Sequence, residues 1–308
     1  MSRASVIAML VAAEVLIAGM ALYAVGHSGT SFAAGMHSVD FQAASIAPVP
    51  VGAAPHVVID DVSSRVHVGV SEDQSVHVRD LTEMHGAIYS NSRYPQLRVT
   101  RTVDGVRIER PRAGDLSIQI FGFSTQAIQV DVPAGSHLEV VSCSGADVFG
   151  VTGNVSVHSN DGHVTLTDLR GSVDARSDDG YIAATNISGN TLAMNSMDGH
   201  LSLKKIAVGS LNAQTRDGRI EAEDLSVTGD STMQTDDGPI RLALAPSSNL
   251  AIDAATSDGS IVVDGHRLDE DDSSQHTIRL GTANVNMKIA TSDGSIHINT
   301  NGDPTNGL

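Results

Sequence analysis

Apolar and polar residues alternate in short runs through the middle of this chain, and one pattern is repeated four times between Gly153 and Gly218. An Asp-Gly pair marks each copy, and apolar residues stand four and six positions before the Asp and three and five positions after it. The apolar pairs before the Asp are Val157 and Val155, Ala175 and Val173, Met194 and Leu192, and Ala213 and Leu211. A period of two is typical of a strand buried on one face. Each copy is therefore predicted to be strand, turn, strand.

The Asp-Gly pairs recur at steps of 18, 19, 19, 20, 21 and 35 residues. The pairs are Asp161-Gly162, Asp179-Gly180, Asp198-Gly199, Asp217-Gly218, Asp237-Gly238, Asp258-Gly259 and Asp293-Gly294. A nearly constant step of this size indicates stacked supersecondary units. We expect the glycines of these pairs to supply the positive φ that tight turns require.

Such a repeat permits either a meander of antiparallel hairpins or a coil whose units stack as rungs. Like residues at matched offsets favour the coil, because stacking then places Val on Val, Ser on Thr and Asp on Asp at ~4.8 Å. The predicted fold is all-β: a single-stranded parallel β-solenoid, a right-handed β-helix, with rungs of about 19 residues.

The N-terminal region points to export. Residues 4–25 are apolar except for Glu14, a Ser and a Gly, which is long enough for a membrane-spanning helix and also compatible with a cleaved signal. We expect a hydrophobic helix within 1–26, as a membrane anchor in preference to a signal peptide. Residues 27–55, rich in Gly, Ala, Ser and Pro, are expected to be a flexible linker.

The remainder divides into a cap, the repeats and a tail. Residues 56–135 alternate without a regular repeat and are expected to form an irregular β cap over the first rung. Within this cap, Leu81 to Tyr94 lacks alternation and is expected to be a loop. Residues 136–300 are expected to hold the solenoid, interrupted by a charged loop at 264–275, and residues 301–308 a polar tail.

Composition narrows the classes of function. The 308 residues include no Trp, 5 Phe and 4 Tyr, as expected for a thin core of small aliphatic side chains. A net charge of −17 argues against nucleic acid as a partner, since its recognition needs a basic patch. The single cysteine, Cys143, excludes an intrachain disulfide and is expected to be structural, because nothing nearby in the sequence would lower its pKa.

The row of aspartates is the first candidate for chemistry. Stacked carboxylates repel one another, and a divalent cation would relieve that repulsion. The alternative is that Asp stands there because Asp-Gly forms the turn, and this is favoured because the denser calcium-binding nonapeptide of other solenoids is absent. No cofactor or metal site is therefore predicted. Calcium remains the alternative for one set of residues: Asp161, Asp179, Asp198, Asp217 and Asp237.

Three other groups of residues are predicted to be structural or surface features. A Ser or Thr precedes each Asp by two positions; its presence in every rung argues against a singled-out nucleophile and for a hydroxyl ladder. His163 and His200 stand two rungs apart, too far for easy shared metal ligation. The basic residues near Asp217 are scattered as on an ordinary solvated face. No catalytic residue is predicted.

Two further runs carry a family resemblance. The run from Ile128 to Val140, IQVDVPAGSHLEV, is followed by Ser-x-x-Gly repeats and a closing run from Ile289 to Ile296, IATSDGSI. Over about residues 56 to 300 the chain resembles the bacterial putative-adhesin domain family, a domain of unknown function. The resemblance implies an envelope β-solenoid, often behind a membrane segment, and carries over no functional residue. The charged loop at 264–275 departs from it.

Together these features predict a non-enzymatic cell-envelope protein. The solenoid would lie outside the cytoplasm, held to the membrane by residues 4–25, and would present its surface for adhesion to envelope proteins, surface proteins or polysaccharide. One alternative is a sensory module whose helix, with Glu14, contacts a membrane partner. Another is an enzyme acting on polysaccharide.

Overall fold

The computed structural model describes residues 36–41, 44–90, 96–111, 117–246, 248–268 and 274–300. Their regular structure is β throughout, as predicted. None of these residues belongs to a helix long and apolar enough to cross a membrane. The predicted hydrophobic helix at 1–26 and the polar tail at 301–308 lie outside the described residues. The chain divides into two compact units.

The smaller unit is a three-stranded antiparallel sheet. Strand β7 (Glu83–Ser90) pairs with β1 (Met36–Phe41) on one side and with β10 (Ser117–Thr125) on the other. Two predictions are wrong here. The flexible linker expected over 27–55 contains β1, and the loop expected over Leu81 to Tyr94 contains β7.

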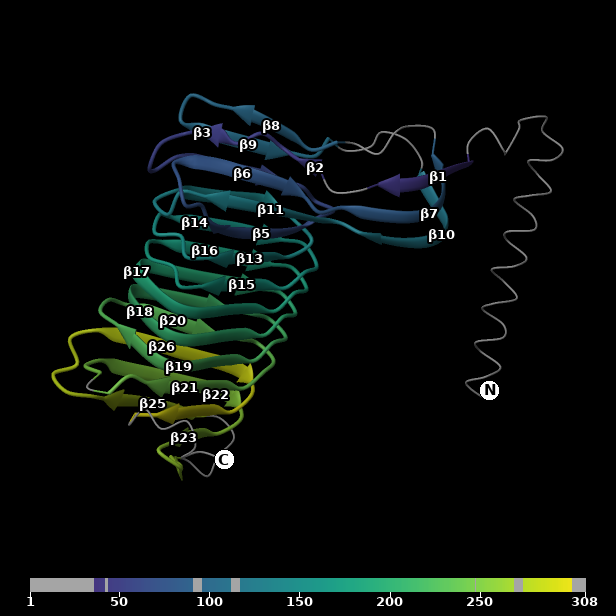
Figure 1. Ribbon diagram of the computed structural model, residues 1–308. Coiled ribbons are helices and arrows are strands. Elements are labelled where there is room, and N and C mark those ends of the chain that lie inside the picture. Colours follow the sequence, from purple (N-terminus) through teal and green to yellow (C-terminus); the bar gives the residue numbers. More distant parts are fainter. Residues whose placement is uncertain are drawn as a thin grey trace, which may run out of the picture. The chain divides into compact units, whose positions relative to one another are not determined.

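The larger unit is a stack of parallel strands that wraps around a core and presents two main faces (Figure 1). We call the first face sheet 1. In spatial order its parallel strands are β9 (Gly105–Glu109), β4 (His56–Asp60), β12 (His137–Ser142), β14 (Val155–Ser159), β16 (Val173–Ser177), the second halves of β17 (Ile182–Ser196) and β18 (Leu201–Gln214), β20 (Ser231–Gln234), β26 (Asn286–Asp293) and β22 (Ala251–Asp258).

The second face, which we call sheet 2, lies on the opposite side of the core from sheet 1. In spatial order its parallel strands are β11 (Ala127–Val132), β5 (Arg65–Val70), β13 (Ala146–Phe149), β15 (Val164–Thr167), the first halves of β17 and β18, β19 (Ile220–Val227), β21 (Ile240–Leu244), β27 (Ile296–Asn299) and β23 (Ile261–Val263). Strands β17 and β18 are long because they run round the corner between the two sheets.

Antiparallel strands close both ends of the stack. At the N-terminal end β8 (Arg98–Arg101) pairs with β9, and β6 (Ser75–Asp80) pairs with β11, β2 (Ala44–Ser45) and β3 (Val49–Pro50). At the other end β25 (Ser274–Arg279) pairs with β22, and β24 (His266–Arg267) pairs with β23. These strands cover edges that would otherwise offer unpaired backbone groups to another chain.

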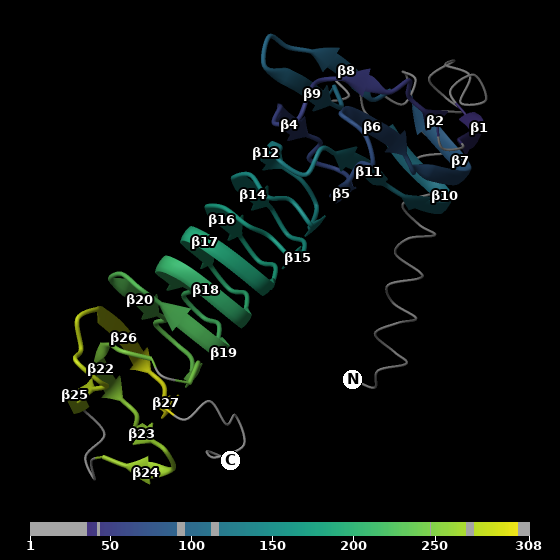
Figure 2. The same cartoon turned by 60° about the vertical axis from the view of Figure 1, so that its left-hand side comes forward.

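The core consists of aliphatic rows that follow the predicted alternation. Val155 pairs in register with Val173, Val173 with Leu192 and Leu192 with Leu211, and each of these side chains is at most 2% exposed. Among the described residues, no aromatic side chain belongs to the buried core. The predicted rung of about 19 residues is therefore confirmed for the middle of the stack, which Figure 2 shows as a regular series from β14 to β18.

The N-terminal rungs do not stack in chain order. Strand β4 lies between β9 and β12, and β5 lies between β11 and β13. The first rung of the chain is therefore inserted between the second and the third. The irregular cap predicted over 56–135 is too broad, because parallel stacking already includes β4 from His56.

The C-terminal rungs show the same departure. Strand β26 lies between β20 and β22, and β27 lies between β21 and β23. The last rung of the chain, β26 and β27, thus lies between the rung of β20 and β21 and the rung of β22 and β23. The predicted charged loop at 264–275 is replaced in part by β24 and the start of β25, and residues 269–273 lie outside the described residues.

Candidate functional site

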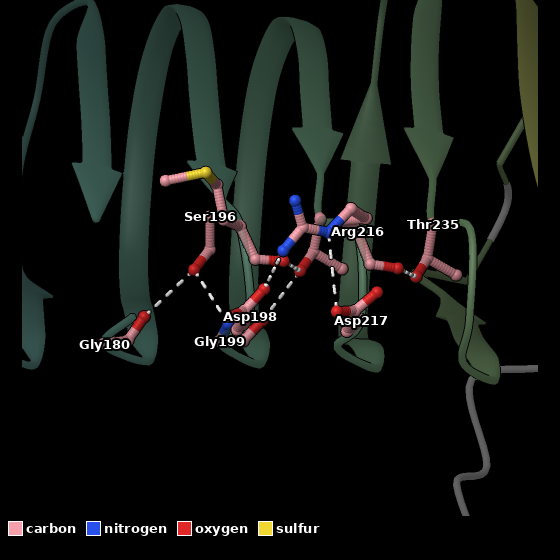
Figure 3. Close-up of polar contacts among 9 residues, drawn as sticks. Gly180, Ser196, Asp198, Gly199, Arg216, Asp217 and Thr235 are labelled. Atoms are coloured by element: carbon pink, nitrogen blue, oxygen red, sulfur yellow. Dashed lines mark hydrogen bonds and ion pairs between the residues drawn. The ribbon is translucent and has the colours of Figure 1, made fainter. Parts of the chain in front are cut away.

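The turn that carries the Asp-Gly pair is held by the predicted hydroxyl ladder (Figure 3). The Gly199 N–H donates to Ser196 Oγ (3.0 Å), and this hydroxyl donates to the carbonyl oxygen of Gly180 in the preceding rung (3.1 Å). Thr235 Oγ1 donates in the same way to the Gly218 carbonyl (2.8 Å). These hydroxyls tie each rung to its neighbour and are engaged with the backbone.

The glycines of these pairs serve close stacking and not positive φ. None of Gly162, Gly180, Gly199 and Gly218 has a positive φ, so that prediction is wrong. A Cβ built on Gly199 would lie 2.0 Å from the Gly180 carbonyl oxygen, far inside van der Waals contact. Each turn therefore accepts only glycine because the backbone of the previous turn lies directly against it.

Positive φ occurs instead at the corner between the two sheets. Asp168, Asn186, Lys205 and Asp224 occupy it in successive rungs, with φ of 56–57°. This left-handed conformation suits Asn and Asp better than Lys. Lys205, which is exposed, adopts this left-handed conformation nonetheless.

The aspartates of the turn row are exposed, and their electrostatics differ along the stack. Arg216 Nη2 lies 2.6 Å from Asp198 Oδ1, and its Nε lies 3.4 Å from Asp217 Oδ2 (Figure 3). Hydrogen bonding to Asp198 raises the pKa of Arg216. One guanidinium thus offsets repulsion between two stacked carboxylates. Within the described residues no group of three or more His, Cys, Asp or Glu is arranged to hold a metal ion.

The inserted last rung brings a different trio of aspartates together. Asp293 lies in register between Asp237 and Asp258. Local desolvation, followed by the charges of both neighbours, raises the pKa of Asp293 above the usual carboxyl value. The predicted calcium row ended at Asp237 and included neither Asp293 nor Asp258, which the structure stacks beyond it. Calcium binding itself stays a prediction.

The remaining sequence candidates are engaged in structural contacts. Cys143 is fully buried, its Sγ 3.5 Å from the His158 carbonyl oxygen, and burial raises the pKa of its thiol. The ring of His163 packs edge-on against Tyr181, with centroids 4.9 Å apart. Lys204 pairs with Glu223 at 2.9 Å. These environments agree with the predicted structural and surface roles.

A buried ion cluster, which no sequence pattern indicated, lies near the N-terminal end of the larger unit. Arg110, whose side chain is 3% exposed, donates from Nε to Asp61 Oδ2 (2.8 Å) and from Nη2 to Asp80 Oδ1 (3.0 Å). Thr82 caps Asp80 through its backbone N–H (3.1 Å). The guanidinium thereby joins three separate segments of the chain.

The outer face of sheet 1 is polar and largely uncharged in its middle. Asn195, Gln214 and Gln234 stand side by side in register on successive rungs. Nearer the N-terminal end a groove of about 510 Å³ crosses the same sheet, and His56 Nε2 lies 3.3 Å from Glu139 Oε2 at its edge. The spacing of these groups is set by the strands beneath them.

The outer face of sheet 2 carries a smaller hollow of about 280 Å³. Phe149 and Asp147 line it from the same strand, β13, and Asp131 lines it from β11, on the far side of β5. Burial acts to raise the pKa of Asp147, but the hydrogen bonds and charge of Arg65 outweigh it, and the pKa lies below the ordinary carboxyl value. The sequence singled out none of these residues.

The stacked parallel strands and the rows of repeated turn residues together define a parallel β-solenoid repeat protein. The chain belongs to the toastrack DUF4097 family, whose model matches residues 56–299, and the predicted family resemblance is confirmed. The match is to a domain family and not to an enzyme family.

Two solved structures are similar over most of the chain at 9% identity. One is a putative cell adhesion protein from Clostridium sporogenes (TM-score 0.27, covering 84% of this chain and 97% of that chain). The other is a putative adhesin from Bacteroides fragilis (TM-score 0.42, covering 86% and 97%). No curated protein sequence matches the chain.

Proposed function

We propose that this protein is a non-enzymatic binding protein of the bacterial cell envelope, which adheres to surface proteins or polysaccharide through the outer faces of its solenoid. The observation that carries the proposal is the register of the outer rows. Asn195, Gln214 and Gln234 repeat the same amide chemistry on strands one spacing apart, which suits a long ligand that makes many weak contacts. Several weak contacts strengthen one another when they engage together.

The contacts of the candidate nucleophiles favour binding over catalysis. A catalytic hydroxyl needs a base and an orienting partner of its own, whereas Ser196, Thr215 and Thr235 donate to glycine carbonyls of the preceding rung. The basic side chains Lys204, Arg216 and Arg219 each face a carboxylate. The same proposal has three further parts. Residues 4–25 anchor the protein in the membrane, the solenoid lies outside the cytoplasm, and its coil is right-handed.

The test compares variants on the two outer faces of the full chain. The chain is coated on beads, and its adhesion to surfaces bearing bacterial envelope proteins or polysaccharide is measured, together with any release of soluble sugar. We expect adhesion without turnover, weakened several-fold by Gln214→Ala combined with Gln234→Ala. The matched comparison, Thr185→Ala combined with Ser202→Ala on sheet 2, should weaken adhesion less, because these two residues are not in register and do not form a row of like side chains. Sugar release without adhesion would contradict the proposal and favour the enzyme alternative.

A further inference from the structure

The hollow on the outer face of sheet 2 exists because one side chain is missing from a row. Gly69 lies in register beside Asp131, and the next strand carries Phe149 beyond it. A Cβ at Gly69 would lie 2.9 Å from Asp131 Oδ1. Because Gly69 has no side chain, its backbone forms the bottom of the hollow between Phe149 and Asp131.

Phe149 is an exposed aromatic residue on the outer face of sheet 2. It is 54% exposed, whereas the described core contains no aromatic side chain. An aromatic ring offers a flat face with negative charge at its centre. Such a face stacks on the C–H groups of a sugar ring or on a cation.

The polar groups of the hollow are held in place before any ligand arrives. Arg65 donates to both oxygens of Asp147, from Nε (2.9 Å) and Nη2 (2.8 Å). Gln129 Nε2 donates to Asp131 Oδ1 (3.2 Å), and Arg79 Nη2 lies 3.5 Å from Asp131 Oδ2. Each carboxylate keeps further lone pairs, which can accept from ligand hydroxyls.

The charges of the hollow cancel, although the chain as a whole has a net charge of −17. Asp131 and Asp147 are matched by Arg79 and Arg65. The two arginines do not line the hollow themselves, and His67, which does, also contacts Asp147 at 3.0 Å. The carboxylates are therefore already paired, which weakens their attraction for a further cation, and they repel an anion. An uncharged ligand with several hydroxyl groups meets neither penalty.

The volume of the hollow fits one ring. At about 280 Å³, it lies just below the ~300–1,000 Å³ of sites that hold drug-sized molecules. We propose that the hollow binds one uncharged sugar ring of a polysaccharide, stacked on Phe149 and hydrogen-bonded through its hydroxyls to Asp131 and Asp147. This inference rests on the proposed adhesive function and names the ligand class for sheet 2.

The experiment measures binding of the full chain to immobilised neutral polysaccharides built from hexoses, N-acetylhexosamines or 6-deoxyhexoses, and to polylysine as a cationic probe. Wild type is expected to bind at least one neutral polysaccharide, with inhibition by the matching methyl glycoside. Phe149→Ala is expected to lower the affinity about tenfold through loss of the ring contact. Gly69→Ala, which fills the hollow from its floor, is expected to lower it as well.

The control is Val141→Ala, which shortens a 41% exposed apolar side chain on β12 of sheet 1. It should bind within a factor of two of wild type. Equal binding by wild type and Phe149→Ala would overturn the proposal, and so would binding to polylysine that depends on Phe149.

The same measurements separate this inference from the proposed function. Adhesion to envelope proteins with no binding to any neutral polysaccharide would overturn the sugar site and leave the adhesive function standing. Absence of binding to every protein and polysaccharide surface would overturn both.

Discussion

The middle of the solenoid and its two ends use the same contacts in a different order. From β14 to β19 each rung lies on the one before it in the chain. At both ends one rung is inserted between two others, as β4 and β26 show. The hydroxyl ladder follows the spatial order, since Thr291 donates to Gly238 (3.0 Å) and Thr256 to Gly294 (2.9 Å). A rung therefore stacks on any rung with a matching turn geometry, whatever the place of that neighbour in the sequence.

Truncation should distinguish the two regions most strongly. A chain ending at Val285 loses four side chains at most 2% exposed: Met287, Ile289, Ile296 and Ile298. At ~1.5–3 kcal/mol each, their loss is roughly 6–12 kcal/mol, comparable with the whole stability of a typical domain. We expect cooperative unfolding, followed by circular dichroism against urea, to be lost.

The control for the truncation removes one complete repeat from the middle, Leu201 to Arg219. Ile220 then takes the place of Leu201, with which it is in register, so the stack closes up. We expect this shortened chain to unfold cooperatively. If the chain ending at Val285 unfolds as cooperatively, then β22 docks directly on β20 and the inserted rung is dispensable.

The ion cluster at the N-terminal end gives the next largest effect. Arg110→Ala leaves Asp61 and Asp80 buried, at 1% and 4% side-chain exposure, without the guanidinium. We expect a loss of about 3–5 kcal/mol in the free energy of unfolding. Arg176→Ala removes an exposed pair with Asp174 in the middle of sheet 1 and should cost at most ~1 kcal/mol. Similar losses in the two variants would show that Arg110 does not hold its segments together.

Glycine substitutions test whether the inserted rung stacks as tightly as a middle rung. A Cβ on Gly199 would lie 2.0 Å from the Gly180 carbonyl oxygen, and one on Gly294 would lie 2.2 Å from that of Gly238. Each Gly→Ala change should cost about 3 kcal/mol in urea unfolding. A mild effect at Gly294 alone would indicate that the last rung lies elsewhere.

The aspartate trio predicts a pH dependence of stability at the C-terminal end of the stack. Because the pKa of Asp293 is raised in the folded chain, its charge destabilises the fold at pH values above that pKa. The penalty fades as the pH falls through the raised value and is absent below the ordinary carboxyl value. Asp293→Asn should therefore raise the melting temperature near pH 7 and lose this advantage near pH 3. Asp179→Asn is the control from the middle of the stack.

The same melting experiment tests calcium. A rise in the wild-type midpoint with calcium, reversed by chelator and absent in Asp293→Asn, would support a cation in the turn row. No calcium effect would leave the aspartates as turn residues.

The smallest expected effect concerns the corner of a middle rung. Lys205 has φ of 56°, and Asn186 occupies the equivalent corner at 57°. Lys205→Asn should stabilise the chain by about 0.5 kcal/mol, because Asn tolerates this conformation better. Lys204→Asn, which removes the pair with Glu223, should not stabilise it. Calorimetry of both variants decides between corner strain and general loss of charge.

The sequence predicts the strands of the middle rungs because alternation and the 19-residue step are local signals. It does not predict the order of the end rungs, because rungs with the same turn chemistry are interchangeable partners. The long step from Asp258 to Asp293 is compatible with a loop and with an inserted rung alike. Only the three-dimensional fit of β26 between β20 and β22 decides between them.

The candidate sites, too, are predictable only where their residues are close together in the sequence. The hydroxyl ladder was predictable, since a Ser or Thr stands three residues before each turn glycine, as in Ser196 and Gly199. The hollow joins Gly69, Asp131 and Phe149 from three strands whose pairing is out of chain order. Arg110 and Asp61 likewise meet because β9 pairs with β4, and Asp80 joins them from β6. An isolated phenylalanine in a chain poor in aromatics is the one local sign of the hollow.

The inserted last rung bears on how the chain is made. During synthesis the strands up to β21 are complete well before β26 leaves the ribosome, and at ~5–20 residues per second the interval lasts seconds. Throughout that time β22 and β23 have no final place to dock, and the edge formed by β20 and β21 stays open to another nascent copy. The protein therefore reaches its closed form only when its last strands arrive, and a holding chaperone would be most useful in that interval.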